Sequence, residues 1–86
     1  ADLYEMIFLA TVYSHFGAIR YKRACEAAGI SAALMPVPRS LSSSCGTCVR
    51  CEGDWLSPSQ ADAEEIEQIV RQLPDGYEVV YRSTEE

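Results

Sequence analysis

The strongest constraint on the fold is an apolar run at residues 6–13, rich in β-branched and aromatic side chains. A run without an alternating polar face predicts a central strand that other elements cover. Ser14 follows at once as a helix N-cap, and residues 15–28 carry an apolar stripe at helical spacing that stops before Gly29. A strand that leads directly into a helix predicts a layered domain in which the helix packs on the sheet.

Three further strands are expected. Residues 30–37 predict a strand whose end lies at a sheet edge, because Pro36 and Pro38 cannot donate to a hydrogen-bond ladder. Residues 47–52 predict a short third strand, and residues 77–82 a last one. Within this last strand, alternation places three side chains on one face: Tyr77, Val79 and Tyr81.

A second helix is expected after Ser57. Ser57 and Pro58 suit the N-cap and first helical position, and Gln60 completes a capping box. Four apolar residues then follow at helical spacing: Ile66, Ile69, Val70 and Leu73. The order β-α-β-β-α-β predicts one α+β domain over residues 1–86, namely a ferredoxin-like four-stranded antiparallel sheet with two helices on one face.

Charge and hydropathy exclude several classes of function. The net charge of −6 argues against general nucleic-acid binding. Residues 1–43 hold three acidic and four basic side chains, whereas residues 44–86 hold ten and three. No apolar run approaches the roughly 20 residues that span a bilayer, so no membrane insertion is expected. With no export signal and clustered thiols, a reducing cytoplasm is the expected location.

The chemistry of the chain is concentrated in residues 45–51, Cys-Gly-Thr-Cys-Val-Arg-Cys, which hold three of the four cysteines. Cys45 follows a serine-rich loop and precedes Gly46, so a tight turn would expose its sulfur. Arg39 lies six residues upstream, where its guanidinium would stabilise a thiolate. Three groups are expected to hold an anion such as a persulfide or selenide: Ser43, Ser44 and Gly46, with Ser42 beside them.

Three segments of the chain carry a family resemblance: FLATVYSHFGAIRYKRACEAAGI, LMPVPRSLSSSCG and the closing residues. They resemble the putative selenium/sulfur carrier protein-like family. The most specific part is the Pro-x-Pro-Arg element, the serine-rich spacer and the Cys-Gly pair. The resemblance implies that Cys45 is the working cysteine and that Arg39 corresponds to the arginine of the family's Pro-Arg element. Cys48 and Cys51 depart from the family pattern, which continues there as an ordinary strand.

The two additional thiols leave two interpretations open. Cys48 or Cys51 would resolve a persulfide or disulfide at Cys45, as paired thiols do. Alternatively, the C-x2-C-x2-C spacing matches three ligands of a bacterial ferredoxin run, and the three would hold a [4Fe-4S] cluster or, less favourably, zinc. The distant Cys25, or a partner protein, would then supply the fourth ligand. A regular strand would point Cys48 and Cys51 to opposite faces, so a metal site requires a loop.

The sequence therefore predicts a small accessory protein rather than an enzyme. It would carry sulfur or selenium, or exchange thiols, and deliver its cargo to a partner enzyme. The alternatives are an iron–sulfur module in an electron-transfer or maturation complex, and a non-catalytic assembly subunit of a larger complex. His15, near a helix start, is interpreted as a surface residue, and Cys25 as part of the core.

Overall fold

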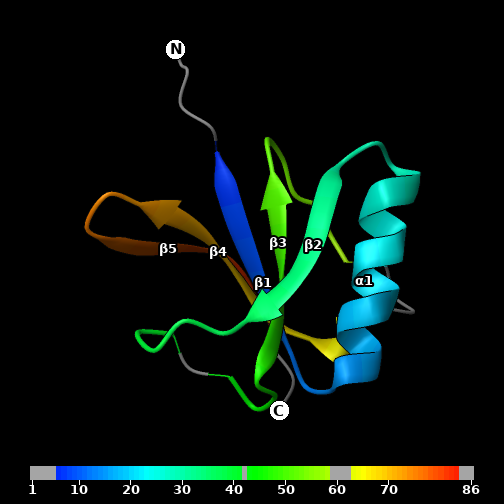
Figure 1. The fold of residues 1–86 in the computed structure, drawn as a ribbon, viewed down its shortest axis with the longest axis horizontal. Coiled ribbons are helices and arrows are strands. Elements are labelled where there is room, and N and C mark those ends of the chain that lie inside the picture. The colour runs from blue at the N-terminus through cyan, green and yellow to red at the C-terminus, as the bar shows by residue number, and fades with distance from the viewer. Residues whose placement is uncertain (1–5, 42, 59–62, 84–86) are drawn as a thin grey trace.

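Strand β1 (Ile7–Val12) runs through the middle of the sheet, as its apolar run predicts. The computed structural model describes residues 6–41, 43–58 and 63–83. Within them, five strands form one sheet in the order β2-β3-β1-β4-β5, and every neighbouring pair is antiparallel (Figure 1). All six residues of β1 are buried because the strand has a partner on each edge and a cover on each face.

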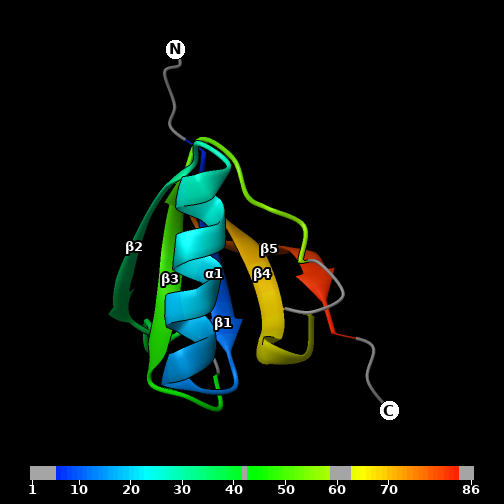
Figure 2. The ribbon, with the colours of Figure 1, turned by 90° about the vertical axis from the view of Figure 1, so that its right-hand side faces the viewer.

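Helix α1 (His15–Ala27) lies against one face of the sheet (Figure 2). Ser14 caps it as predicted, and its side chain accepts a hydrogen bond from the Gly17 N–H at 3.1 Å. Gly29 has φ of 85°, a left-handed conformation that glycine adopts without strain just after a helix. The buried face includes Tyr21 and Cys25, so the predicted helical stripe is confirmed over its central part.

Strands β2 (Ser31–Pro36) and β3 (Thr47–Glu52) lie on one side of β1. β2 pairs only with β3 and forms a sheet edge, as Pro36 predicts. β3 pairs with both β2 and β1, and Cys51 lies opposite Phe8 while Cys48 lies opposite Thr11. Residues 47–52 are therefore a regular strand rather than a loop.

The predicted second helix is wrong, and with it the ferredoxin-like architecture. The residues that were expected to form its apolar stripe form strand β4 (Ile66–Leu73), after a short 3₁₀ turn, η1 (Ala63–Glu65). Ser57 and Pro58 are not helical, and Gln60 lies outside the described residues. Within the described residues the protein has one α-helix and five antiparallel strands, instead of two helices on four strands.

A β-bulge explains why β4 resembles a helix in the sequence. Ile69 pairs with Ala10 and Ile66 pairs with Val12, so a step of three residues along β4 matches a step of two along β1. The register shifts between Thr11 and Val12. The bulge brings Ile66 and Ile69 to the same face despite their spacing of three. The free edge of β1 supplies hydrogen-bond partners for this β-branched segment, and that pairing overrides its local helical pattern.

A second irregularity corrects the predicted face of strand β5 (Gly76–Arg82). Val70 pairs with Val79 and Ile69 pairs with Tyr81, which leaves one extra residue on β5. Tyr77 and Tyr81 consequently pack on opposite sides of the sheet, although simple alternation placed them together. A tight turn at residues 74–75 joins β4 to β5.

The two faces of the sheet carry separate hydrophobic clusters. We call them the helix-side core and the loop-side core. The helix-side core comprises Phe8, Ala10, Val12, Ala18, Tyr21, Cys25, Val49, Cys51, Ile66 and Ile69. The loop-side core comprises Ile7, Leu9, Cys48 and Val70, with Met35, Val37, Leu41 and Tyr77 packed against it. The connection between β2 and β3 therefore helps to cover the face that α1 leaves open.

Candidate functional site

The β2–β3 connection, residues 37–46, carries most of the predicted site. We call this connection the Cys45 loop. The Val37 N–H donates to the Gly46 carbonyl at 3.1 Å and closes the base of this loop, and the Leu41 N–H donates to the Pro38 carbonyl at 3.0 Å. Val37 and Leu41 pack against the loop-side core. The loop is thus anchored at its base and at one apolar side chain, and it returns the chain to β3.

Cys45 stands at the end of this loop with a free, half-buried thiol. Its N–H donates to Ser43 Oγ at 3.2 Å, and Ser43 Oγ lies 3.4 Å from the Val12 carbonyl at the end of β1. Cys45 also packs against the helix-side core. Gly46 is exposed, and nothing lies within 4 Å of the position that a Cβ would take there. The thiol therefore lies at the rim of the core, beside open space.

The start of α1 forms the neighbouring part of this rim. His15 Nδ1 lies 3.4 Å from Thr47 Oγ1, which joins the first turn of α1 to the first residue of β3. Two large side chains near this helix start are exposed to solvent: Tyr13 at 43% and Phe16 at 61%. The predicted surface position of His15 is confirmed. This end of the molecule thus presents aromatic side chains next to the elements that hold Cys45.

Two glutamate side chains at this end accept hydrogen bonds from serine residues. Glu67 accepts from the Ser44 N–H at 3.2 Å and from Ser44 Oγ at 3.1 Å. Glu65 accepts from Ser14 Oγ at 3.1 Å, and a Cβ on Gly17 would lie 2.7 Å from its Oε1. The Ser44 donors that the sequence assigns to an anionic cargo are therefore bound to an acidic side chain of β4.

Arg39 is exposed in the loop. Among the described residues, no hydrogen bond or ion pair joins Arg39 to Cys45, so their pairing stays a prediction. Ser42, the third serine of the expected anion site, lies outside the described residues.

The other two thiols of the motif lie on opposite faces of β3. Cys51 belongs to the helix-side core and Cys48 to the loop-side core, and neither side chain is exposed to solvent. Burial raises the pKa of Cys48 to about 11. Of the two predicted resolving thiols, Cys51 shares a face with Cys45 and Cys48 does not. The alternation of a regular strand causes this separation.

Cys51 faces Cys25 of α1 across the helix-side core. Their sulfur atoms lie 3.8 Å apart, and both side chains are 0% exposed. The hydrogen bond with Cys51 lowers the pKa of Cys25 to about 7. The same hydrogen bond, with burial, raises the pKa of Cys51. Sequence reasoning placed Cys25 in the core but missed this contact, since only the crossing of α1 over β3 brings the two thiols together.

The predicted metal centre has no support from this arrangement. Among the described residues, no group of three or more His, Cys, Asp or Glu side chains is placed to hold a metal ion. Cys48 and Cys51 are separated by the thickness of the sheet. The [4Fe-4S] and zinc interpretations stay predictions without a geometric basis. Within the described part of the chain, no helix is long and apolar enough to cross a membrane.

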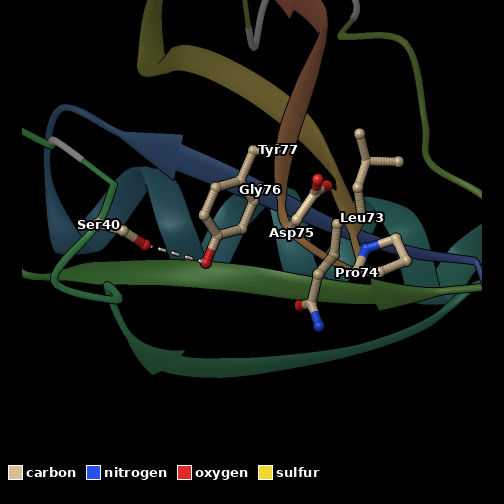
Figure 3. Close-up of a pocket in the computed structure, with 7 residues that line it drawn as sticks. Ser40, Leu73, Pro74, Asp75, Gly76 and Tyr77 are labelled. Atoms are coloured by element: carbon tan, nitrogen blue, oxygen red, sulfur yellow. Dashed lines mark hydrogen bonds between the residues drawn. The ribbon is translucent and has the colours of Figure 1, made fainter.

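Two surface hollows flank the loop. One, of about 410 Å³, adjoins Ser44 through Glu67 and is lined by Tyr13, Glu67, Gln68, Arg82 and Ser83. The other, of about 520 Å³, is lined by Ser40, Gln72, Leu73, Pro74, Asp75, Gly76 and Tyr77 (Figure 3). There Ser40 Oγ lies 3.4 Å from the Tyr77 hydroxyl, so the loop touches the turn between β4 and β5.

A family model described as putative Se/S carrier protein-like matches residues 8–82. No curated protein and no solved structure matches the chain.

Proposed function

Because the chain belongs to the putative Se/S carrier protein-like family, we propose that it carries sulfur or selenium on Cys45 and delivers it to a partner protein. The observation that supports this choice of residue is the exposure of the four thiols. Cys45 is half-buried at the rim of the core, whereas the other three cysteines are fully buried. A carrier thiol must meet both a donor and a receiver, and a rim position permits both encounters.

The proposed transfer consists of two nucleophilic displacements. The Cys45 thiolate attacks the outer sulfur of a donor persulfide, the sulfur–sulfur bond of the donor breaks, and the donor thiolate leaves. Cys45 then holds a persulfide. A nucleophile of the receiver attacks the terminal sulfur, and Cys45 leaves as a thiolate. Neither displacement requires an external oxidant or reductant, because one sulfur–sulfur bond is exchanged for another bond to sulfur in each step.

The surroundings of Cys45 suit contact with a protein partner. Tyr13 and Phe16 expose large aromatic surfaces at the same end of the molecule, and such residues are enriched at interfaces. The Arg20 guanidinium lies 5.7 Å from the Phe16 ring centroid, which adds a positive charge to that surface. Glu67 places a negative charge beside Ser44, so a receiver with a basic group near its nucleophile would be favoured here.

The test is sulfur loading followed by intact-protein mass spectrometry. The reduced full chain is treated with inorganic polysulfide, desalted, and mapped by peptide digestion. We expect the mass of one or more sulfur atoms on Cys45, and none in a Cys45→Ser variant. A Cys48→Ala variant is the matched control, since it removes a fully buried thiol, and it should load as the unaltered chain does. Unchanged loading of Cys45→Ser, or sulfur found on the buried thiols alone, would refute the proposal.

A further inference from the structure

The thiol–thiol contact described above joins Cys51 of the predicted motif to Cys25, which lies outside the motif. Cys25 Sγ and Cys51 Sγ are 3.8 Å apart, although 26 residues separate them in sequence. A disulfide requires about 2.05 Å between the sulfurs, so the two sulfurs must approach each other by about 1.8 Å on oxidation. The carrier role proposed for Cys45 does not use this pair.

The surroundings of the pair are apolar and closely packed. Both thiols are 0% exposed and lie in the helix-side core with Tyr21, whose hydroxyl bonds the backbone of Leu56. Either sulfur can donate the hydrogen bond between Cys25 and Cys51, and when Cys51 donates, the contact favours the Cys25 thiolate. Such proton sharing within a dithiol leaves one sulfur nucleophilic and the other protonated.

Access to the pair is through the end of α1. Cys25 lies two residues before the last residue of the helix, and the residues that follow, Ala27 to Gly29, are exposed. The Ile30 N–H donates to the Cys25 carbonyl at 2.9 Å, so the backbone of Cys25 belongs to the final turn of the helix. Terminal turns open at a lower free energy than the core of a domain.

We propose that Cys25 and Cys51 form a redox-sensitive dithiol, which small hydroperoxides oxidise to a disulfide that fastens α1 to β3. The Cys25 thiolate attacks one oxygen of hydrogen peroxide, the oxygen–oxygen bond breaks, and hydroxide leaves, so that Cys25 becomes a sulfenic acid. The Cys51 sulfur then attacks Cys25 Sγ, and its proton leaves with the sulfenic hydroxyl as water. The two thiols lose two electrons, which the peroxide accepts.

The disulfide would join the helix layer to the sheet layer. It closes a loop of the chain that contains β2, the Cys45 loop and most of β3. Oxidation therefore restricts the unfolded chain and fixes the helix end, without occupying Cys45. The oxidation state of the dithiol would change the stability of the helix and sheet that anchor the Cys45 loop. This property is separate from sulfur loading itself.

The test uses the full chain, reduced and then exposed to hydrogen peroxide, quenched by alkylation in denaturant. Peptide mapping of the unaltered chain should show a linked pair of peptides that contain Cys25 and Cys51, and dithiothreitol should separate them. A double variant, Cys45→Ser with Cys48→Ala, retains only the proposed pair and should form the same link. Its thermal midpoint should rise by roughly 10 °C or more on oxidation.

Two results would overturn the proposal. One is a map of the unaltered chain in which the disulfides join other cysteines; this measurement needs no variant to fold. The other is a folded double variant that keeps both thiols after prolonged exposure to a large excess of peroxide over protein. Failure of Cys45 to take up sulfur would leave the dithiol proposal intact, because the double variant lacks Cys45.

Discussion

The Cys45 loop and the Cys25–Cys51 pair use the same functional group in opposite environments. Cys45 is half-buried next to exposed Gly46, and polar contacts hold its loop to β1 and β4. Cys25 and Cys51 are fully buried between α1 and β3. Cysteines that are close together in the sequence therefore need not share an environment, because β3 places its two cysteines on opposite faces of the sheet.

The largest expected difference between the two regions is in chemical accessibility. In the native chain, N-ethylmaleimide should label Cys45 at least about a thousandfold faster than Cys25 or Cys51, because labelling of a buried thiol requires an opening that costs several kcal/mol. Timed labelling followed by peptide mass spectrometry measures each rate. In denaturant the rates should converge. Comparable native rates would show that the interior pair is open to solvent.

The next difference is in stability. Tyr21→Phe should lower the free energy of unfolding by about 2 kcal/mol, because the Tyr21 hydroxyl donates to the Leu56 carbonyl at 2.6 Å and accepts from its N–H at 3.1 Å. Urea unfolding measures the loss. Tyr13→Phe is the matched control, since Tyr13 is exposed, and it should change little. Sulfur loading of Cys45 should be the same in both variants. A loss of loading in Tyr21→Phe alone would show that the helix-side core and Cys45 are functionally coupled.

The smallest expected effect concerns the loop-side core and depends on pH. Burial raises the pKa of Cys48 from 9.0 to about 11, so the folded state keeps a proton that the unfolded chain releases above pH 9. The corresponding stability is complete below pH 9 and is lost as pH rises through 11. Under reducing conditions, the free energy difference between the unaltered chain and Cys48→Ala should therefore fall by about 1–2 kcal/mol between pH 8 and pH 11.

If the difference in the free energy of unfolding between these two proteins stayed constant across that pH range, it would contradict the burial of the Cys48 thiol. Because Tyr21 and Cys51 are present in both proteins, their own titrations cancel in the comparison.

Local signals in the first half of the chain predicted its structure well. The apolar run became β1, Ser14 became the cap of α1, and Pro36 ended an edge strand. Each of these outcomes depends on contacts within a few residues, or on burial so extensive that only a central strand satisfies it. The family was also recognised from short motifs, which persist whatever the distant packing.

The second half was predicted less well because its signals were ambiguous. A spacing of three between Ile66 and Ile69 suits a helix, but it also suits a strand with one bulge. Only the free edge of β1, far away in sequence, selects the strand. Glu67 of that strand accepts hydrogen bonds from the Ser44 donors of the expected anion site, a contact that also depends on how β4 is placed.

The sequence by itself determined a domain with a central β1 and a capped helix, and it identified the family. The tertiary structure decided the number of helices, the side of the sheet on which each β3 thiol lies, and the meeting of Cys25 with Cys51. The physical reason is range. Capping, proline geometry and burial act locally, whereas strand pairing, bulges and helix-to-sheet contacts depend on partners that the chain brings together only when it folds.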